Sequence, residues 1–275
     1  MKNIAVLLTV FNRKKKTLEC LRKLYDQRIP EAYSLEVYMV DDGSSDGTSN
    51  AVALEFPKVN VIRGNGDLFW NRGMHKAWIE AMNKKNYDFY LWLNDDTFIF
   101  EGALETIILD SKNKDDRSII CGTTQSLSGS KLSYGGRNEN GELIRPSNVL
   151  KECKYMNGNF VLIPKFVNDL VGTIDPVFRH SIGDLDYGLR AQKKGVQVFV
   201  ASKVIGACDN HQSLPKWCLI DIPLKRRLKS LYSPLGNSHP YYFFIYENRH
   251  HGLLVAMKHF FTIHLRALFP RLWKI

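Results

Sequence analysis

Cysteine is sparse in this 275-residue sequence, and its five positions lie far apart. No Cys-x-x-Cys pair occurs, so the spacing indicates neither a zinc site nor a disulfide framework. An odd number of cysteines without a secretory leader predicts a protein of the reducing cytoplasm. The five are Cys20, Cys121, Cys153, Cys208 and Cys218.

Long hydrophobic runs are also missing. No stretch reaches the roughly 18 apolar residues of a membrane-spanning helix, so we expect none. The closest approach, residues 252–269, is interrupted by Lys258, His259, His264 and Arg266. The apolar residues 4–10 have no cleavage site of small residues after them, which argues against a signal peptide. With no repeat or low-complexity segment, the sequence predicts one large globular domain or two small ones.

Acidic residues are scarce near the C-terminus. From residue 214 onward, ten Lys and Arg residues stand against Asp221 and Glu247, so this part carries most of the net charge of +10. Residues 223–275 combine this charge with leucines and many aromatic residues. A basic amphipathic helix of this composition can lie on an anionic membrane surface. The alternatives are that these helices pack on the rest of the protein or form a homodimer.

Regular alternation of strand and helix patterns is present in the first half. We expect strands at 4–10, 35–40, 59–63 and 87–93, and helices at 15–27, 48–56 and 70–84. The glycine-rich residues 117–165 predict a β-rich excursion, before a helix at 183–195 and a strand at 196–201. Such alternation predicts an α/β fold with a mostly parallel sheet and helices on both faces. The polar clusters at 9–13, 41–47 and 94–97 should then meet at the carboxyl edge of the sheet, where ligands bind.

The tripeptide Asn94-Asp95-Asp96 follows an apolar strand. Two adjacent carboxylates beside a buried sheet repel each other, and a divalent cation removes that cost. Mg²⁺ and Mn²⁺ prefer carboxylate oxygen and share their coordination with substrate phosphates. The pair therefore predicts a metal that holds a diphosphate, with a simple polar turn as the alternative.

Three further segments at the expected edge suggest nucleotide binding. The segment containing Thr9, Phe11, Asn12 and Arg13 can offer backbone groups and a guanidinium, or can be an ordinary turn. Asp42 can accept the N–H of a pyrimidine ring, although Asp-Gly segments also favour turns. In residues 64–73, glycines allow close approach to a ligand and aromatic rings offer stacking surfaces, unless those rings are simply buried. The residues proposed from this third segment are Gly66, Asp67 and Trp70.

The predicted helix at 183–195 opens with two carboxylates, Asp184 and Asp186. They are two residues apart and so do not share a helix face. One can point into a cleft as a general base, while the other caps the helix or pairs with Arg190. His211 is a candidate third metal ligand, although a lone histidine is more often structural.

The order of these motifs resembles glycosyltransferase family 2 enzymes of the GT-A fold, over about residues 3–212. The resemblance rests on TVFNR at 9–13, VDDGSSDGT at 40–48, LNDDT at 93–97 and GDLDYGLRAQKKG at 183–195. It looks closest to bacterial enzymes of surface polysaccharide synthesis, including the rhamnosyltransferase-like group. It implies that Asp184 is the catalytic base, although Gly183 replaces the Glu that precedes the base in many relatives. It further implies metal binding by Asp96 and Asp95, donor binding by Asp42 and Asn94, and a sugar and acceptor pocket with Asn157, Gly158, Asn159 and Asp186.

The resemblance also implies an organisation and an activity. Residues 1–212 would form the catalytic domain, with a nucleotide-sugar half (1–110) and an acceptor half (111–212), and residues 213–275 a helical extension. The expected reaction is an inverting transfer of a hexose-type sugar from a UDP- or dTDP-linked donor to a saccharide or lipid-linked saccharide. It would depend on Mn²⁺ or Mg²⁺ and would take place on the inner face of the cell membrane. The alternatives are a sugar-nucleotide nucleotidyltransferase and a non-catalytic basic binding protein. The acidic clusters argue against nucleic acid as a partner.

Overall fold

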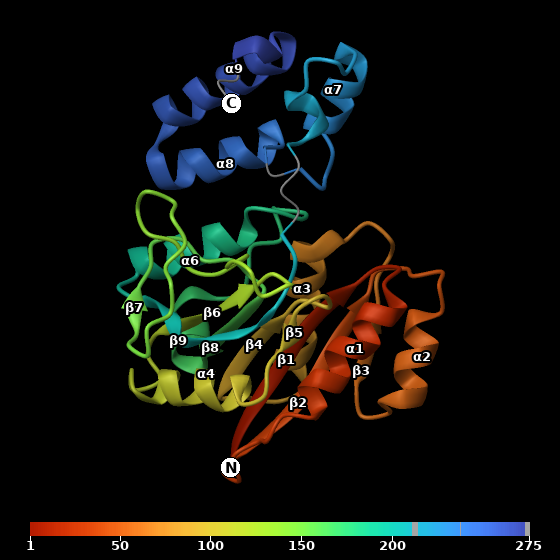
Figure 1. Ribbon diagram of the computed structural model, residues 1–275, viewed down its shortest axis with the longest axis vertical. Helices are drawn as coiled ribbons and strands as arrows, with labels where there is room; N and C mark the ends of the chain where they lie inside the picture. Colours follow the sequence, from red (N-terminus) through yellow and green to blue (C-terminus); the bar gives the residue numbers. More distant parts are fainter. Residues whose placement is uncertain (211–213, 237, 273–275) are drawn as a thin grey trace.

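The computed structural model describes residues 1–210, 214–236 and 238–272 (Figure 1). Its first part has the strand and helix alternation expected from the sequence, with bounds that differ by a few residues. The elements are β1 (Lys2–Val10), α1 (Lys14–Tyr25), β2 (Tyr33–Asp41), α2 (Thr48–Glu55), β3 (Asn60–Arg63), α3 (Phe69–Lys84), β4 (Phe89–Leu93), β5 (Phe98–Ile99) and α4 (Ala103–Lys112).

The second part is richer in strands and loops. A long loop joins β6 to β8 and contains only a two-residue strand and isolated bridges, which agrees with the expected glycine-rich β excursion. Further on, the expected helix at 183–195 and the strand after it are both present. The elements are β6 (Ile119–Gln125), β7 (Lys151–Glu152), β8 (Phe160–Pro164), α5 (Lys165–Val171), α6 (Gly183–Lys193) and β9 (Val198–Ala207).

All of these strands belong to one mixed sheet, whose longest ladders, β1 with β2 and β6 with β9, are parallel. Its order is β3-β2-β1-β4-β8-β6-β9-β5, with β7 beside β9. The pairs among β3, β2, β1 and β4 are parallel, as is β6 with β9, whereas the pairs made by β8, β5 and β7 with β4, β6 or β9 are antiparallel. The helical crossovers that parallel pairing needs are confined largely to the first half. Because β8 runs against β4, residues just before β8 reach the edge where β4 ends.

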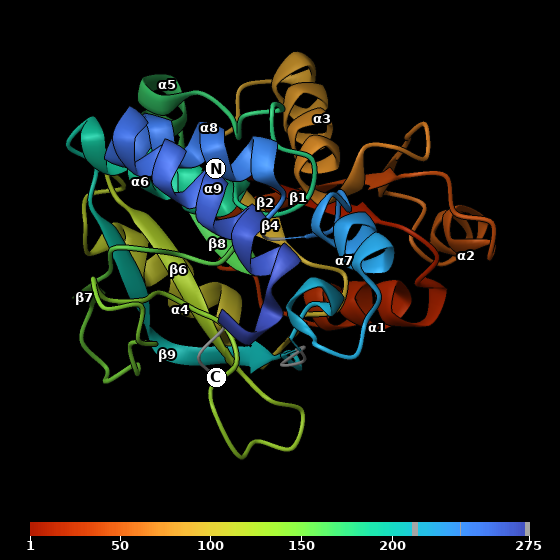
Figure 2. The ribbon, with the colours of Figure 1, turned by 90° about the horizontal axis from the view of Figure 1, so that it is seen from above.

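Alternation along the strands divides the apolar side chains between two faces. Ile4, Val6 and Leu8 of β1 pack with α1, α2 and α4, whereas Ala5 and Leu7 pack on the side of α3, α5 and α6. Seen from above, α1 and α4 lie on one side of the sheet and α3 and α5 on the other (Figure 2). The α/β fold with helices on both faces, expected from the sequence, is confirmed.

A helical extension lies over the carboxyl edge of the parallel strands (Figure 1). Part of it packs on itself, through Trp217, Leu231 and Ile263. Another part packs on α6 and the segment before it, where Tyr246 joins Phe178, Ile182 and Leu189. Its elements are the 3-10 turn η1 (Lys216–Cys218), α7 (Leu224–Leu231), α8 (Pro240–His251), α9 (Leu253–Leu268) and the 3-10 turn η2 (Pro270–Leu272).

Candidate active site

A cavity of about 810 Å³ opens at the carboxyl edge of the parallel strands. The register of the sheet explains its position, because Val10 at the end of β1 lies opposite Asp41 at the end of β2. Most of the residues selected from the sequence converge here. Those that line the cavity are Thr9, Phe11, Arg13, Asp42, Gly66, Trp70, Asn94, Asp95, Asp96, Asn157, Gly158, Asn159 and Asp184.

The acidic pair at the end of β4 is bridged by a guanidinium. Arg13 Nη1 donates to Asp95 Oδ1 at 3.1 Å and to Asp96 Oδ2 at 2.7 Å. Burial raises the pKa of Asp95 to about 6, with Asp96 adding to the shift and Arg13 opposing it. Burial more than repulsion thus disfavours the charged form of Asp95, and the guanidinium between the two carboxylates opposes both effects.

The donor chemistry of this pair fits Mg²⁺ or Mn²⁺. Both side chains offer carboxylate oxygen, and Asp96 also accepts a weak hydrogen bond from Cys208 Sγ at 3.7 Å. Over residues 1–210, 214–236 and 238–272, no group of three or more His, Cys, Asp or Glu side chains is placed to hold a metal. His211, the proposed third ligand, lies outside the described residues. The pair thus suits a hard cation that takes its remaining ligands from water and substrate phosphates.

Asp42 organises the loop that forms one wall of the cavity. Its Oδ1 accepts the backbone N–H of Gly66, and its Oδ2 accepts those of Leu68 and Phe69, each at 2.9 Å. These bonds hold the start of α3, where Phe69 has a positive φ of 58°. Trp70 follows and donates from Nε1 to Asn94 Oδ1 at 2.7 Å, which links this loop to the end of β4. The carboxylate of Asp42 therefore contributes to the cavity mainly by holding the backbone of this loop in place.

Asp184 stands at the start of α6 and is held by main-chain donors. Its Oδ2 accepts the N–H of Gly158, and its Oδ1 accepts that of Leu185, both at 2.9 Å. Burial raises the pKa of Asp184 above its ordinary value, although these hydrogen bonds oppose the shift. A carboxylate with a raised pKa in a cleft is a stronger base than one in water.

The glycine before Asp184 is required by its neighbour on α3. A Cβ added at Gly183 would lie only 1.6 Å from Oδ1 of Asn71. Asn71 is fully buried and donates from Nδ2 to the carbonyl oxygens of Asp175 at 2.7 Å and Phe178 at 2.9 Å. The contact with Asn71 therefore explains why position 183 is Gly and not the Glu of the Glu-Asp pattern. The same asparagine anchors the loop that leads into Asp184 to α3.

Asn12 and Asp67 lie outside the cavity. Asn12 joins the ends of β1 and β2, because its Oδ1 accepts the N–H of Ser45 at 2.8 Å. Asp67 is exposed and forms an ion pair with Arg179. Both residues hold loops that flank the cavity, and neither lines it, so the direct donor contacts expected of them stay predictions.

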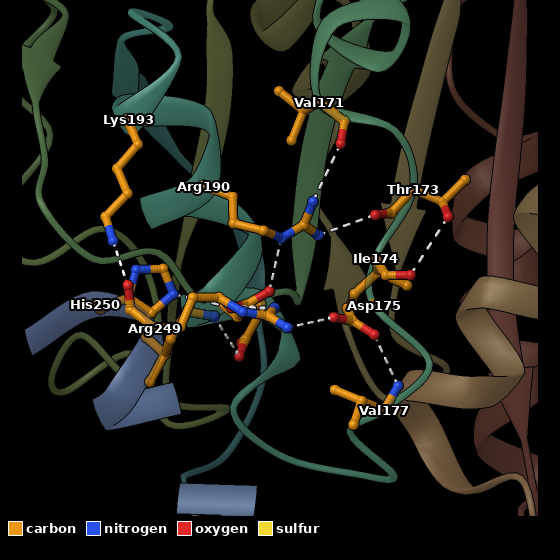
Figure 3. A network of polar contacts seen from close by, with 12 residues as sticks. Val171, Thr173, Ile174, Asp175, Val177, Arg190, Lys193, Arg249 and His250 are labelled. Carbon is orange, nitrogen blue, oxygen red and sulfur yellow. Dashed lines mark hydrogen bonds and ion pairs between the residues drawn. The ribbon is translucent and has the colours of Figure 1, made fainter. Parts of the chain in front are cut away.

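Asp186, expected in the acceptor pocket, does not line the cavity either. It is fully buried on the other side of α6, where it pairs with Arg190 and with Arg249 Nη1, each at 2.8 Å. Nε2 of His250 lies 2.9 Å from the same carboxylate, and the second arm of Arg249 reaches Asp175 (Figure 3). The pairing with Arg190 was one of the two roles expected for this carboxylate. The sequence could not reveal that a distant helix, α8, completes the network.

The extension supplies cavity residues that the sequence did not identify. Leu235, Ser238, Phe243 and Tyr246 line the cavity together with Asp184. The rings of Phe243 and Tyr246 are stacked with centroids 6.1 Å apart. The only sequence signal for these residues was the aromatic run at 241–246. That run does not indicate which part of the protein α8 packs against. The helical extension thus lines part of the cavity and also packs on α6.

A family comparison fits this geometry. Residues 5–168, more than half of the chain, match the model of "Glycosyl transferase family 2". The chain belongs to glycosyltransferase family 2. Membership confirms the enzyme class expected from the order of the motifs, a glycosyltransferase, and decides against the nucleotidyltransferase.

Similar proteins of known name or structure agree with this assignment. The chain is 28% identical to the poly-beta-1,6-N-acetyl-D-glucosamine synthase of Staphylococcus epidermidis over 122 residues. The matched segment covers 44% of this chain and 28% of that protein. The chain thus spans little more than a quarter of that relative. S. aureus TarS 1–349 has a TM-score of 0.57 at 15% identity, covering 98% of this chain and 82% of that one. The mannosyltransferase PcManGT from Pyrobaculum calidifontis, in complex with GDP-Man and Mn²⁺, has a TM-score of 0.56 at 14% identity over 98% and 81% of the two chains. At this identity, the structural likeness shows a shared GT-A fold.

Proposed function

We propose that this protein transfers a hexose-type sugar, with inversion, from a nucleoside diphosphate sugar to a saccharide or lipid-linked saccharide in bacterial surface polysaccharide synthesis. One observation carries the proposal: a half-buried carboxylate, Asp184, and a charge-paired acidic dyad, Asp95 and Asp96, line the same cavity. A base and a cation site in one cleft are what such a transfer requires, because the base activates the acceptor and the cation offsets the charge on the leaving diphosphate.

The donor is proposed to lie over residues 1–110. TarS has been solved with UDP and with UDP-GlcNAc, and PcManGT with GDP-Man, so nucleotide sugars bind to proteins of this fold. The wall formed by Gly66 and Trp70 offers close backbone approach and an aromatic ring to a nucleotide. We take a UDP- or dTDP-linked sugar as the donor class. The acceptor is proposed to enter beside residues 157–159 and Asp184, in the 111–212 half.

Asp184 acts as the general base in this proposal. It removes the proton from the acceptor hydroxyl, and the resulting oxygen attacks the anomeric carbon from the face opposite the diphosphate. One displacement inverts the configuration and requires no covalent nucleophile on the protein, by the same logic that governs inverting hydrolysis. The N–H groups of Gly158 and Leu185 fix the carboxylate in the orientation this step needs.

The dyad is proposed to hold Mn²⁺ or Mg²⁺, with Asp96 as the main ligand and Asp95 behind it. When bound there, the cation supplies positive charge that offsets the charge on the leaving diphosphate. Arg13 contacts both carboxylates, and its guanidinium is also close enough to the dyad to serve the same phosphates.

The test is nucleotide-sugar turnover by wild-type protein and by Asp184→Asn, with Mn²⁺, with Mg²⁺ and with EDTA. We expect the asparagine variant to lose transfer by at least about 10²-fold, the usual contribution of a general base, while donor affinity by calorimetry stays within about twofold. EDTA should stop the wild-type reaction and added Mn²⁺ should restore it. Asp169→Asn on α5 is the matched control, because Asp169 is exposed, does not line the cavity and forms a surface ion pair with Lys165.

Two results would count against parts of the proposal. Loss of donor binding in Asp184→Asn, in step with loss of turnover, would remove the role of base. Full activity in EDTA would remove the metal from the dyad while leaving Asp184 in place.

A further inference from the structure

The outer helix α9 carries apolar residues on its outward side as well as on its inward side. Its inward side carries the small or medium residues Ala256, Ile263 and Ala267, all buried. Its outward side carries large apolar residues at helical spacing, among them Leu254 and Phe261, which are 83% and 64% exposed. A helix on the surface of a soluble domain normally places such residues toward the core. The exposed apolar residues are Leu253, Leu254, Met257, Phe261, Leu265, Leu268 and, just beyond the helix, Phe269 and Leu272.

This outward side, called the α9 face below, forms one end of the molecule. In Figure 1 α9 lies farther from the sheet than α8, and in the view from above it lies over α8 (Figures 1 and 2). Successive residues at 254, 257, 261, 265 and 268 fall on one stripe of a helix with 3.6 residues per turn. Scattered surface leucines need no explanation, but a continuous stripe of this kind marks a binding surface.

The charges around the α9 face indicate what it binds. Lys258 lies at the edge of the stripe, and Arg271 follows α9, both exposed. The neighbouring helix α7 adds exposed Lys225, Arg226 and Lys229 at the same end of the molecule (Figure 1). Within residues 214–236 and 238–272, the acidic side chains are Asp221 and a buried Glu247. The face is therefore an apolar stripe with a cationic border.

We propose that the α9 face docks on the surface of a membrane that contains anionic lipids. The leucines and phenylalanines would enter the boundary between headgroups and acyl chains, and the lysines and arginines would meet the lipid phosphates. The 16 residues of α9 span about 24 Å at 1.5 Å per residue, and α9 would lie flat in the interface. Among the helices in the described residues, none is long and apolar enough to cross a membrane.

A second copy of the chain fits this face less well. A twofold dimer would bring the same patch of each copy together, so the cationic borders would oppose each other. Like charges placed across an interface weaken association, whereas an anionic lipid surface complements them. The inference is independent of the proposed reaction, because it rests on exposure and charge in the extension alone.

The experiment is flotation of the full-length protein with vesicles of phosphatidylcholine, with and without phosphatidylglycerol. We expect wild-type protein to float with the anionic vesicles. The double variant Leu254→Glu/Phe261→Glu should partition at least about tenfold more weakly, because it removes two large apolar side chains and adds negative charge. Lys225→Gln/Lys229→Gln should weaken binding to anionic vesicles only. The matched control is Leu54→Glu on α2, where an 87% exposed leucine lies away from the extension.

Folding and association are measured on the same samples. All the substituted side chains are exposed, so thermal unfolding should change little. The proposal is overturned if wild-type protein does not float with anionic vesicles, or if the double variant floats as well as Leu54→Glu. It is equally overturned if light scattering finds that wild-type protein is a dimer and the double variant a monomer, while wild-type protein does not bind vesicles. In that case a second copy covers the α9 face.

Discussion

At the scale of single residues, the site depends on a few side chains that hold other groups in place. Asp42 illustrates this, because its carboxylate gathers three backbone N–H groups of the loop before α3. Asn71 does the same from α3, binding the carbonyl groups of the segment that leads to Asp184. Such residues act on the chemistry through the backbone, and their removal should displace the groups they hold.

The contact between Gly183 and Asn71 gives a direct prediction. Gly183→Ala places a methyl group against Asn71 Oδ1, and overpacking of this kind costs about 1–3 kcal/mol. We expect a lower urea midpoint and a reduced turnover rate, because Asp184 is the next residue. Removing the obstacle in the double variant Asn71→Ala/Gly183→Ala should recover part of the loss.

A double-mutant cycle on unfolding free energies measures that recovery. A coupling energy of zero would mean that the two residues do not contact each other in solution. Gly195→Ala is not a suitable control because Gly195 has a positive φ of 82°. Gly188→Ala on the same helix is better, since its nearest neighbour is the flexible side chain of Met156, with 3.2 Å to the added Cβ.

At the scale of secondary-structure elements, α6 has two different sides. Asp184 faces the cavity, and Asp186 binds Arg249 and His250 of α8. Burial would raise the pKa of Asp186, but the hydrogen bonds from His250 and Arg190 and the nearby guanidinium charges outweigh it, and its pKa is lowered. The helix that begins with Asp184 is thereby attached to α8, which lines part of the cavity.

The lowered pKa of Asp186 predicts a pH dependence. A carboxylate with a depressed folded-state pKa stabilises the protein above its unfolded pKa of about 4, and this stability is lost as pH falls through the folded value. Asp186→Asn should therefore cost about 3–5 kcal/mol at neutral pH, because Arg249 and Arg190 lose a buried partner. The variant should also show a smaller loss of stability on acidification than wild-type protein.

The measurement is urea unfolding across the range from neutral to acid pH. Asp169→Asn serves as control, since its ion pair with Lys165 is largely exposed and should contribute about 0–1 kcal/mol. Equal effects of the two substitutions would contradict the structural role given to Asp186.

At the scale of the whole molecule, the extension closes the site. Residues of the sheet domain line most of the cavity, and α8 with the segment before it supplies Leu235, Ser238, Phe243 and Tyr246. Phe243 and Tyr246 present stacked rings on this side. Sugars stack on aromatic faces, so this side of the cavity suits the saccharide acceptor proposed above.

The acceptor side of the cavity predicts a separation between acceptor and donor effects. Phe243→Ala should raise the acceptor KM or lower transfer by roughly tenfold, while donor hydrolysis in the absence of acceptor stays near wild-type values. Tyr241→Ala is the matched control, because Tyr241 lies on the same helix, is exposed and does not line the cavity. A parallel fall in donor hydrolysis would instead place Phe243 on the donor side.

The sequence by itself determined the local elements and the polar ends of the strands. The alternation of apolar residues in β1 and their helical spacing in α1 and α3 can be recognised from short stretches of sequence. The same is true of the acidic pair after β4 and of the carboxylates that begin α6. These signals were enough to predict the α/β class, and together with the family resemblance, which alone pointed to Asn157, Gly158 and Asn159, they selected thirteen residues that line one cavity.

Only the tertiary structure decided which of these residues face the cavity. Asp186, Asn12 and Asp67 have the same acidic or amide chemistry as their neighbours, but their partners are distant in sequence: Asp186 reaches Arg249, Asn12 reaches Ser45 and Asp67 reaches Arg179. The antiparallel entry of β8 and the docking of α8 likewise depend on long-range packing, which periodicity along the chain does not encode. Residue type sets what a side chain can do, and its position among remote neighbours sets what it does here.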